Sequence, residues 1–260
     1  MNALVTGASA GIGRALAREL ALGGAKVAVA ARRTAPLEQL AEEIERAGGT
    51  RPVILRADLS QPGEAARLAE RALEALGEID LLVNNAGSNL RGRQDAVADS
   101  PAARAMLELN YWSPLALTAQ LAPQMVARGR GAIVNVASIS ALTPMPENGH
   151  YSSSKAALSL ATETLRMELH GTGVHVLSVL PGPVQTDMLE QVKAELPAGR
   201  KMLERTPRGT PEALAKKIVR AVEKRQPRVV YPAALGFIRR FPNFSLWAAH
   251  KLAPQFATES

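Results

Sequence analysis

Cysteine is absent from the 260 residues, and aromatic residues make up only 3% of them. Without cysteine the chain has no disulfides, no thiolate catalysis and no thiolate zinc site. The four histidines are scattered and show no zinc-ligand spacing, so we expect no metal. Since few aromatic residues and no stacking motif accompany the basic residues, we also expect no nucleic-acid partner.

Long hydrophobic runs are also missing, because no stretch approaches the roughly 18 uncharged apolar residues of a membrane span. The first predicted strand begins almost at Met1, which leaves no room for a secretory signal. The lack of cysteine fits a reducing compartment. We therefore expect a cytoplasmic protein.

No Ser/Gly-rich linker, low-complexity tract or internal repeat divides the chain, and 47% of its residues are apolar, enough for a large core. We predict one domain over residues 1–232, which includes a substrate lid at about 184–210. A helical periodicity of apolar residues in that segment, after the carboxyl end of a predicted strand, suits a lid or a surface helical hairpin. Residues 233–260 extend the same domain.

The net charge of +7 is unevenly distributed along the chain. Residues 200–240 hold twelve Lys/Arg against three Glu, a charge of +9, and the other 219 residues carry −2. A basic face of this kind suits anionic lipid, an acidic partner or a phosphorylated substrate. A solvated helix face in an arginine-rich protein is the simpler explanation, and we favour it.

Strand-like and helix-like segments alternate throughout, which is the pattern of βαβ units on a parallel sheet. Helical stretches at 14–22, 36–47, 62–76 and 152–170 separate short apolar runs. The sequence predicts a Rossmann-type, doubly wound α/β fold, with about seven parallel strands and helices on both faces of the sheet. The predicted strands lie at 3–5, 26–31, 53–56, 81–84, 132–136, 174–180 and 228–231.

A glycine-rich turn, Thr6-Gly7-Ala8-Ser9-Ala10-Gly11-Ile12-Gly13, joins the first strand to a helix. Small residues let the backbone approach a pyrophosphate, and the helix N–H groups favour its negative charge. The same residues match the G-x-S-x-G nucleophile elbow of hydrolases. That elbow needs an oxyanion-hole loop from an earlier strand, and only six residues precede it. We therefore favour a dinucleotide site formed by Gly7, Ser9, Gly11, Ile12 and Gly13.

Arg32 and Arg33 directly follow the second predicted strand. A dinucleotide fold that prefers NAD usually has an acidic residue there for the ribose 2′-hydroxyl, and Ala31 occupies that position. A guanidinium instead binds a 2′-phosphate, and Arg14, just after the glycine-rich turn, is a second candidate. The sequence favours NADP(H) over NAD(H), although such arginines are also typical of surface charges flanking a helix.

Polar residues end the third and fourth predicted strands. Asp58 is positioned either to accept a hydrogen bond from adenine or to cap the following turn. Asn84-Asn85-Ala86-Gly87 closes the fourth strand, where amides can touch a cofactor or tie down the neighbouring strand. Asp58, Asn85, Ala86 and Gly87 are therefore candidate cofactor contacts.

Tyr151 and Lys155 are four residues apart, and Ser138 lies thirteen residues before the tyrosine. On a helix, residues i and i+4 share a face, so the ammonium can lie close to the phenol. A nearby positive charge would draw the phenol pKa down from about 10 toward neutrality. This spacing indicates redox chemistry on a carbonyl or alcohol, with Tyr151 moving the proton.

Taken together, these motifs resemble the short-chain dehydrogenase/reductase family in its single-domain form. The resemblance runs from Met1 to about Tyr231. It rests on Thr6-Gly7-x-x-x-Gly11-x-Gly13, Asn84-Asn85-Ala86-Gly87, Asn110, Ser138, Tyr151-x-x-x-Lys155 and Pro181-Gly182-Pro183-Val184-x-Thr186.

The resemblance implies a role for each catalytic candidate. Tyr151 would be the general acid in reduction and, as phenolate, the base in oxidation. Lys155 would lower the tyrosine pKa and hold the nicotinamide ribose. Ser138 would hydrogen-bond the substrate oxygen, with Ser140 as a less favoured alternative. Asn110 would anchor a water in a proton relay to Lys155, or serve as a plain hydrogen-bonding residue of a helix.

The resemblance also implies further cofactor contacts and an assembly. Pro181, Gly182, Val184 and Thr186 are expected at the cofactor, where Gly182 and Thr186 would flank the nicotinamide and Thr186 would contact its carboxamide. Helices flanking the Tyr151 segment commonly form subunit contacts in this family. We therefore expect a homodimer or homotetramer.

The segment after Tyr231 departs from the compact form of the family and is the most aromatic part of the chain. Three uses compete, in the order that we expect them: covering the core or substrate pocket, packing against a second subunit, or lying on a membrane surface. An apolar lid and an aromatic tail suggest a lipophilic carbonyl or alcohol substrate. The alternative to an enzyme is a sensor or scaffold that binds NADP without turnover.

Overall fold

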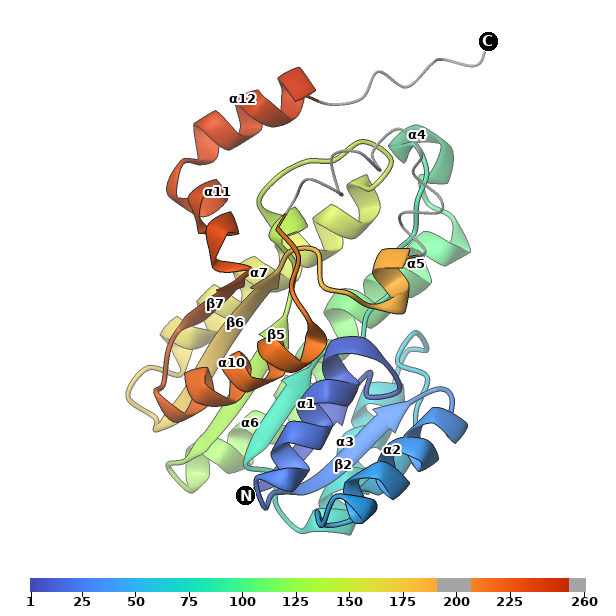
Figure 1. Cartoon of the computed structure of the whole chain (residues 1–260), viewed down its shortest axis with the longest axis vertical. Helices are drawn as coiled ribbons and strands as arrows, with labels where there is room; N and C mark the ends of the chain where they lie inside the picture. Colours follow the sequence, from blue (N-terminus) through green and yellow to red (C-terminus); the bar gives the residue numbers. More distant parts are fainter. Residues whose placement is uncertain (191–206, 253–260) are drawn as a thin grey trace.

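The computed structural model describes residues 1–190 and 207–252. These residues form one seven-stranded parallel sheet in the order β3-β2-β1-β4-β5-β6-β7 (Figure 1). The predicted doubly wound fold and its seven strands are confirmed. The strands are β1 (Asn2–Thr6), β2 (Lys26–Ala31), β3 (Val53–Arg56), β4 (Leu81–Asn84), β5 (Gly131–Val136), β6 (Val174–Pro181) and β7 (Arg228–Tyr231).

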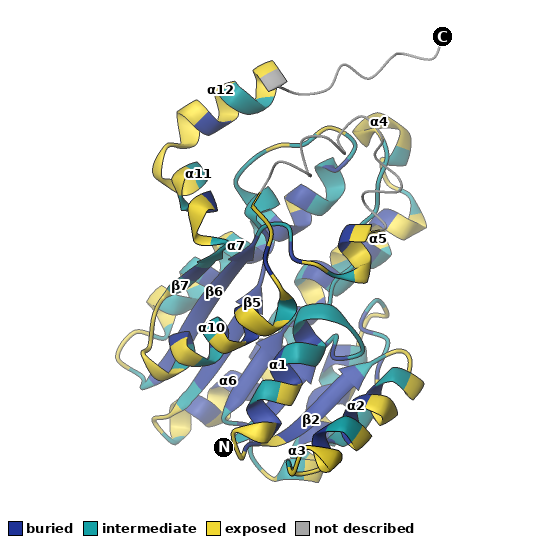
Figure 2. Ribbon diagram, in the orientation of Figure 1, coloured by how far each residue is buried: buried dark blue, intermediate teal, exposed yellow. Residues whose placement is uncertain are grey.

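Helices cover both faces of the sheet, as side-chain alternation along the strands requires. In β1, Ala3 and Val5 belong to one core cluster and Leu4 to the other. The first cluster takes in α1 (Gly11–Leu22), α2 (Ala35–Arg46) and α10 (Pro211–Glu223), and the second takes in α3 (Glu64–Leu76) and α6 (Ser113–Ala127). Figure 2 shows the buried strands between these layers.

Shorter elements decorate the carboxyl edge of the sheet. They are α4 (Gln94–Val97), α5 (Pro101–Leu107), the π-helical turn η1 (Glu108–Trp112), the 3-10 turn η2 (Ile139–Ala141) and the long α7 (Gly149–Glu168). After β7 come η3 (Ala233–Leu235), α11 (Gly236–Arg240) and α12 (Pro242–Leu252). Within the described parts of the chain, no helix combines the length and the apolar character needed to cross a membrane.

The strand order creates a crevice at the carboxyl edge between β1 and β4. From β1 the chain moves outward to β2 and β3, and from β4 it moves the other way through β5, β6 and β7. In open α/β sheets, ligands bind where the strand order reverses in this way. The glycine-rich turn follows β1 and the Asn-Asn-Ala-Gly segment follows β4, so both motifs meet at this crevice.

Several element bounds are shifted by one to three residues from the sequence prediction, and the role expected for the tail changes. Helix α1 begins at Gly11, three residues before the predicted start, because the glycine-rich turn forms its first turn. The expectation that the tail covers the core is wrong for its aromatic side chains. Phe241, Phe244 and Trp247 are more than half exposed. Helices α11 and α12 instead project from the end of the sheet (Figure 1).

Candidate active site

Hydrogen bonds between the ends of β1 and β4 fix the base of the crevice. The Thr6 hydroxyl donates to the Val83 carbonyl at 3.1 Å and accepts from the backbone N–H groups of Asn85 and Ala86, each at 3.0 Å. The Asn85 amide donates to the carbonyls of Thr6, at 2.9 Å, and Gly7, at 3.3 Å. The Asn85 side chain therefore ties two strand ends together, which was one of its two predicted uses.

The glycines of the turn are required by close backbone approach. A Cβ on Gly13 would lie 2.4 Å from the Asn85 amide nitrogen, and one on Gly11 would lie 2.9 Å from the Thr186 methyl. Gly7 and Gly11 also have positive φ angles. No side chain caps the N-terminus of α1, so its first N–H groups are left for an anionic ligand.

Three catalytic candidates meet at the end of β5. Ser138 follows the strand, and Tyr151 and Lys155 come from the first turns of α7. Ser138 and Tyr151 share a side-chain hydrogen bond. The Lys155 ammonium donates to the Val136 carbonyl at 3.0 Å, and both Ser138 and Lys155 are buried. The bond to Tyr151 supports Ser138 over Ser140 as the partner of the phenol.

Burial dominates the electrostatics of this cluster. It lowers the pKa of Lys155 from 10.5 to about 8, because desolvation penalises the ammonium. It also raises the pKa of Tyr151, and the hydrogen bond with Ser138 opposes that rise. The predicted downward shift of the tyrosine pKa is therefore not found in this structure, since desolvation of the phenolate outweighs the favourable contacts.

Asn110 lies on the π-helical turn and is fully buried. Its side-chain oxygen accepts from the Ser88 N–H, and its amide donates to the Ser88 carbonyl and the Ser154 hydroxyl, all at 3.0 Å. A Cβ on Gly87 would lie 3.1 Å from that oxygen and 3.2 Å from the Lys155 nitrogen. Both hydrogens of the side-chain amide are already donated in hydrogen bonds. A relay water could therefore be held only by an oxygen atom of Asn110, as an acceptor.

The predicted cofactor side chains at β2 and β3 differ in availability. Arg32 and Arg33 are exposed at the end of β2, and neither makes an ion pair or side-chain hydrogen bond within residues 1–190 and 207–252. Arg14 forms a two-point ion pair with Glu43 at 2.8 and 3.1 Å. Asp58 accepts from the backbone and hydroxyl of Ser60, so it caps the turn as its alternative reading predicts.

The residues after β6 fold back toward the glycine-rich turn. The Gly182 N–H donates to the Tyr231 carbonyl at 2.7 Å, and the Thr186 hydroxyl donates to the Val184 carbonyl at 3.2 Å. Val184 pairs with Gly209 in an isolated parallel bridge, which joins the two ends of the predicted lid. Residues 191–206 of that lid lie outside the described residues.

Sequence reasoning missed a clasp between the loop after β4 and the start of α7. Arg91 and Glu147 form an ion pair at 2.7 Å, and the Gly92 N–H donates to the Glu147 carbonyl at 2.9 Å. His150 contacts the Ala98 carbonyl at 2.8 Å. The clasp lies four residues before Tyr151. No local pattern signals it, because the paired charges are 56 residues apart.

The described residues contain no group of three His, Asp or Glu side chains arranged to hold a metal ion. They do contain the elements of a dinucleotide crevice and, beside it, a buried serine, a buried lysine and a partly exposed tyrosine in one cluster. Such a cluster can hydrogen-bond a substrate oxygen and exchange a proton with it.

Comparisons with known proteins agree with this geometry. The sequence profile described as short chain dehydrogenase matches residues 1–197. Dehydrogenase/reductase SDR family member 7B of Rattus norvegicus is 35% identical over 71% of this chain and 58% of that protein. The 11-beta-hydroxysteroid dehydrogenase A of Arachis hypogaea is 36% identical over 71% of this chain and 52% of that protein. The chain thus spans little more than half the length of these curated relatives.

A solved structure extends the likeness over the whole chain. The short-chain dehydrogenase from Sphingobium yanoikuyae in complex with NADPH is 26% identical, with a TM-score of 0.79, and covers 100% of this chain and 97% of its own. The match of the family profile, the sheet order and the Ser138, Tyr151 and Lys155 cluster lead to one conclusion. The chain belongs to the short-chain dehydrogenase/reductase family.

Proposed function

We propose that this protein is an NADP-dependent oxidoreductase that transfers hydride between the nicotinamide and a carbonyl or secondary alcohol of a lipophilic substrate. The observation that carries the proposal is the cluster of Ser138, Tyr151 and Lys155 at the end of β5, in which the serine and the lysine are buried and the tyrosine is partly exposed. The bound cofactor supplies or accepts the hydride. The chain supplies binding, orientation and the proton.

Each residue of the cluster then has a defined task. Ser138, already hydrogen-bonded to the phenol, would donate to the substrate oxygen as negative charge develops on it. Tyr151 would deliver its proton to that oxygen in reduction and recover one in oxidation. The Lys155 ammonium, held by the Val136 carbonyl, would counter the cost of the buried phenolate.

The choice of NADP(H) rests on the two arginines at the end of β2. Arg32 and Arg33 are exposed and without partners in the described chain, so their guanidiniums are available to a 2′-phosphate. Arg14 is already paired with Glu43 and is the weaker candidate. The lipophilic substrate is supported by the name of the Arachis hypogaea relative, a hydroxysteroid dehydrogenase.

Substitution of the tyrosine tests the chemistry. In Tyr151→Phe, we expect kcat with NADPH and a panel of ketones and aldehydes to fall by about 10²–10⁴-fold. NADPH affinity should stay near the wild-type value, and Tyr111→Phe should remain active. Near-normal turnover in Tyr151→Phe would refute the role of Tyr151 as the general acid. Tight NADPH binding by an unmodified protein that turns over no substrate would favour the sensor or scaffold alternative.

The cofactor preference is tested by a matched pair of variants at the two ends of β2, at Arg32 just after the strand and at Lys26 at its start. Arg32→Glu should weaken NADPH binding much more than NADH binding, because a carboxylate repels the 2′-phosphate. Lys26→Glu makes the same charge change at the exposed first residue of the strand and should leave both affinities unchanged. Equal loss of NADPH and NADH affinity in Arg32→Glu would refute the preference.

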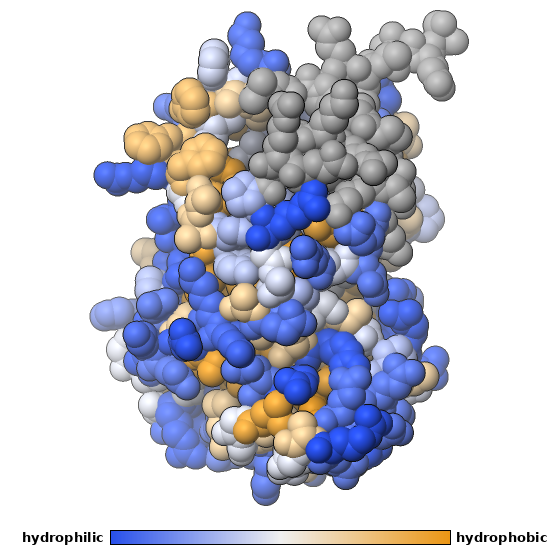
Figure 3. All heavy atoms as spheres, viewed as in Figure 1, coloured by the Kyte–Doolittle hydropathy of each residue, from blue (hydrophilic) through white to orange (hydrophobic). Residues whose placement is uncertain are grey.

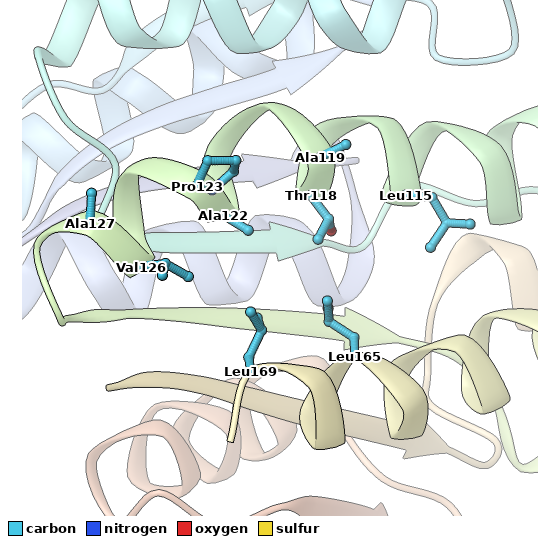
Figure 4. A pocket seen from close by; sticks show the side chains of 9 residues that line it. All are labelled: Leu115, Thr118, Ala119, Ala122, Pro123, Val126, Ala127, Leu165 and Leu169. Carbon is cyan, nitrogen blue, oxygen red and sulfur yellow. The ribbon is translucent and has the colours of Figure 1, made fainter. Parts of the chain in front are cut away.

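We also propose that two copies pack through α6 and the end of α7. An apolar groove of about 590 Å³ lies between these helices, lined by residues such as Leu115, Ala119, Leu165 and Leu169 (Figure 4). In light scattering, Ala119→Arg should shift the protein toward monomer. Gln120→Arg, on the next exposed position of α6, should not. An unchanged mass for Ala119→Arg would refute this assembly.

A further inference from the structure

The segment formed by α11 and α12, residues 236–252, is called here the aromatic tail. It follows η3 at the carboxyl edge of the sheet and projects from the body of the protein (Figure 1). Its rings face solvent: Phe237 is 48% exposed, Phe241 and Phe244 are 58% exposed, and Trp247 is 57% exposed. Rings that contribute neither to the core nor to the catalytic cluster require another partner.

These rings recur every three or four residues along the two helices of the tail. Phe244 and Trp247 contact each other with ring centroids 5.7 Å apart. The Ser245 hydroxyl is buried against the carbonyls of Phe241 and Ile238, which joins α12 to α11. Figure 3 shows apolar side chains grouped over these two helices, with hydrophilic ones beside them.

The charged side chains of the tail itself are all positive. Arg239, Arg240 and Lys251 are exposed, and the sequence has no Asp or Glu between residues 224 and 258. At the base of the tail, partial desolvation and the nearby charge of Arg228 lower the pKa of Arg239. Arg228 is paired with Glu163 on α7, so Arg239 adds positive charge that this acid does not offset.

This combination selects one kind of partner. Aromatic rings that enter the headgroup region, next to arginines that contact phosphates, are typical of segments lying on anionic membranes. A second copy of the same tail would bring like charges together, which disfavours self-association. Helix α12 has only 11 residues, about 16 Å of helix, so it is suited to lie in the interface and too short to cross it.

We propose that the aromatic tail binds the surface of anionic lipid membranes, with its exposed rings at the boundary of headgroups and acyl chains. Leu235, just before the tail, packs directly against Gly182. A Cβ added to Gly182 would lie only 2.1 Å from the Cδ1 atom of Leu235. The tail is therefore attached beside the end of β6, at the edge of the candidate site. If the proposed function holds, membrane contact brings the edge of the active site close to lipophilic substrates that are dissolved in the membrane.

Trp247 provides the probe for the test. The chain has two tryptophans, so Trp112→Phe leaves Trp247 as the single emitter. We expect its emission to shift to shorter wavelength, and the full chain to sediment, with vesicles of phosphatidylcholine and phosphatidylserine. Pure phosphatidylcholine should give much weaker binding, and salt raised to about 0.5 M should release the protein, since ions screen exposed charges.

Paired variants separate the contributions of charge and rings. Arg239→Ala/Arg240→Ala should weaken partitioning by about 25-fold, because each basic residue near such a surface contributes about 1 kcal/mol. Arg46→Ala/Arg67→Ala removes the same charge from exposed positions elsewhere and should change it far less. Phe241→Ser/Phe244→Ser should abolish the emission shift. Because all six positions lie outside the core clusters, loss of folding is not expected.

Several outcomes would overturn the proposal. They are no binding to anionic vesicles, equal binding to neutral ones, or dissociation of an oligomer by Phe241→Ser/Phe244→Ser without lipid. A changed KM in that variant without vesicles would instead assign the tail to the pocket. Vesicle binding requires no turnover, so the Tyr151→Phe protein should bind as tightly as wild type. Failure of the enzymatic proposal is thereby distinguished from failure of this one.

Discussion

Lys155 is a buried ionisable group, so its protonation changes the free energy of unfolding, which can be measured. Burial lowers its pKa from 10.5 to about 8 in the folded protein. Between these two pH values the unfolded chain keeps a proton that the folded protein releases. The free energy of unfolding must therefore rise with pH across this window. Below about pH 8 the lysine is protonated in both states, so this increase is absent.

The size of the effect follows from the shift. At 1.36 kcal/mol per pKa unit, the full displacement corresponds to about 3 kcal/mol. From about pH 7 to about pH 9.5, roughly 2 kcal/mol of it should appear, because the unfolded lysine is only partly deprotonated at the upper value. Lys155→Met keeps most of the side-chain length and removes the ionisable amine, so the variant should lack this rise.

The measurement is urea unfolding of the protein without added cofactor, at both pH values, for wild type, Lys155→Met and Lys26→Met. Lys26 is an exposed lysine, so its variant should follow wild type. Subtracting the pH response of Lys155→Met cancels the titration of groups that do not interact with Lys155, so the difference reports this lysine and its coupling to Tyr151. If wild type and Lys155→Met respond to pH within about 0.5 kcal/mol of each other, the buried-cation reasoning is wrong.

Three further variants test other parts of the site. Asn110→Ala removes the three hydrogen bonds of a buried side chain and should cost about 3 kcal/mol, a fall in Tm of roughly 6–12 °C by calorimetry; an unchanged Tm contradicts this. Gly13→Ala should weaken NADPH binding by about tenfold or more in a fluorescence titration, because the added Cβ would lie 2.4 Å from the Asn85 amide nitrogen. Gly236→Ala is the control, since a Cβ there would meet no atom within 4 Å. Glu147→Gln leaves the Arg91 guanidinium unpaired and should destabilise the protein by about 2 kcal/mol in urea unfolding, with equal stability refuting the clasp.

The sheet was predictable because each strand is a short apolar run bounded by turn residues. Strands buried on both faces carry this signal in their own sequence, as 26–31 and 81–84 do, and the observed bounds agree. The catalytic cluster around Tyr151 was predictable for a similar reason. Tyr151 and Lys155 are related by helical spacing, so a local pattern was enough to bring them together.

Other features depend on contacts that no local pattern contains. The clasp of Arg91 and Glu147 joins loops far apart in the sequence. The direction of the Tyr151 pKa shift depends on the balance between desolvation of the phenol and its hydrogen bond with Ser138, and sequence spacing does not contain that balance. The tail has the composition of a buried segment, and only the structure shows that its rings are exposed.

The two ends of the described chain lie at opposite poles of the molecule (Figure 1). Met1 precedes the amino edge of the sheet, whereas α12 stands beyond its carboxyl edge. An affinity tag or fluorescent protein fused ahead of Met1 would therefore be remote from the crevice and from the exposed rings. The same fusion after α12 would stand next to the exposed rings, and an acidic tag there would oppose the positive charge of Arg239 and Arg240.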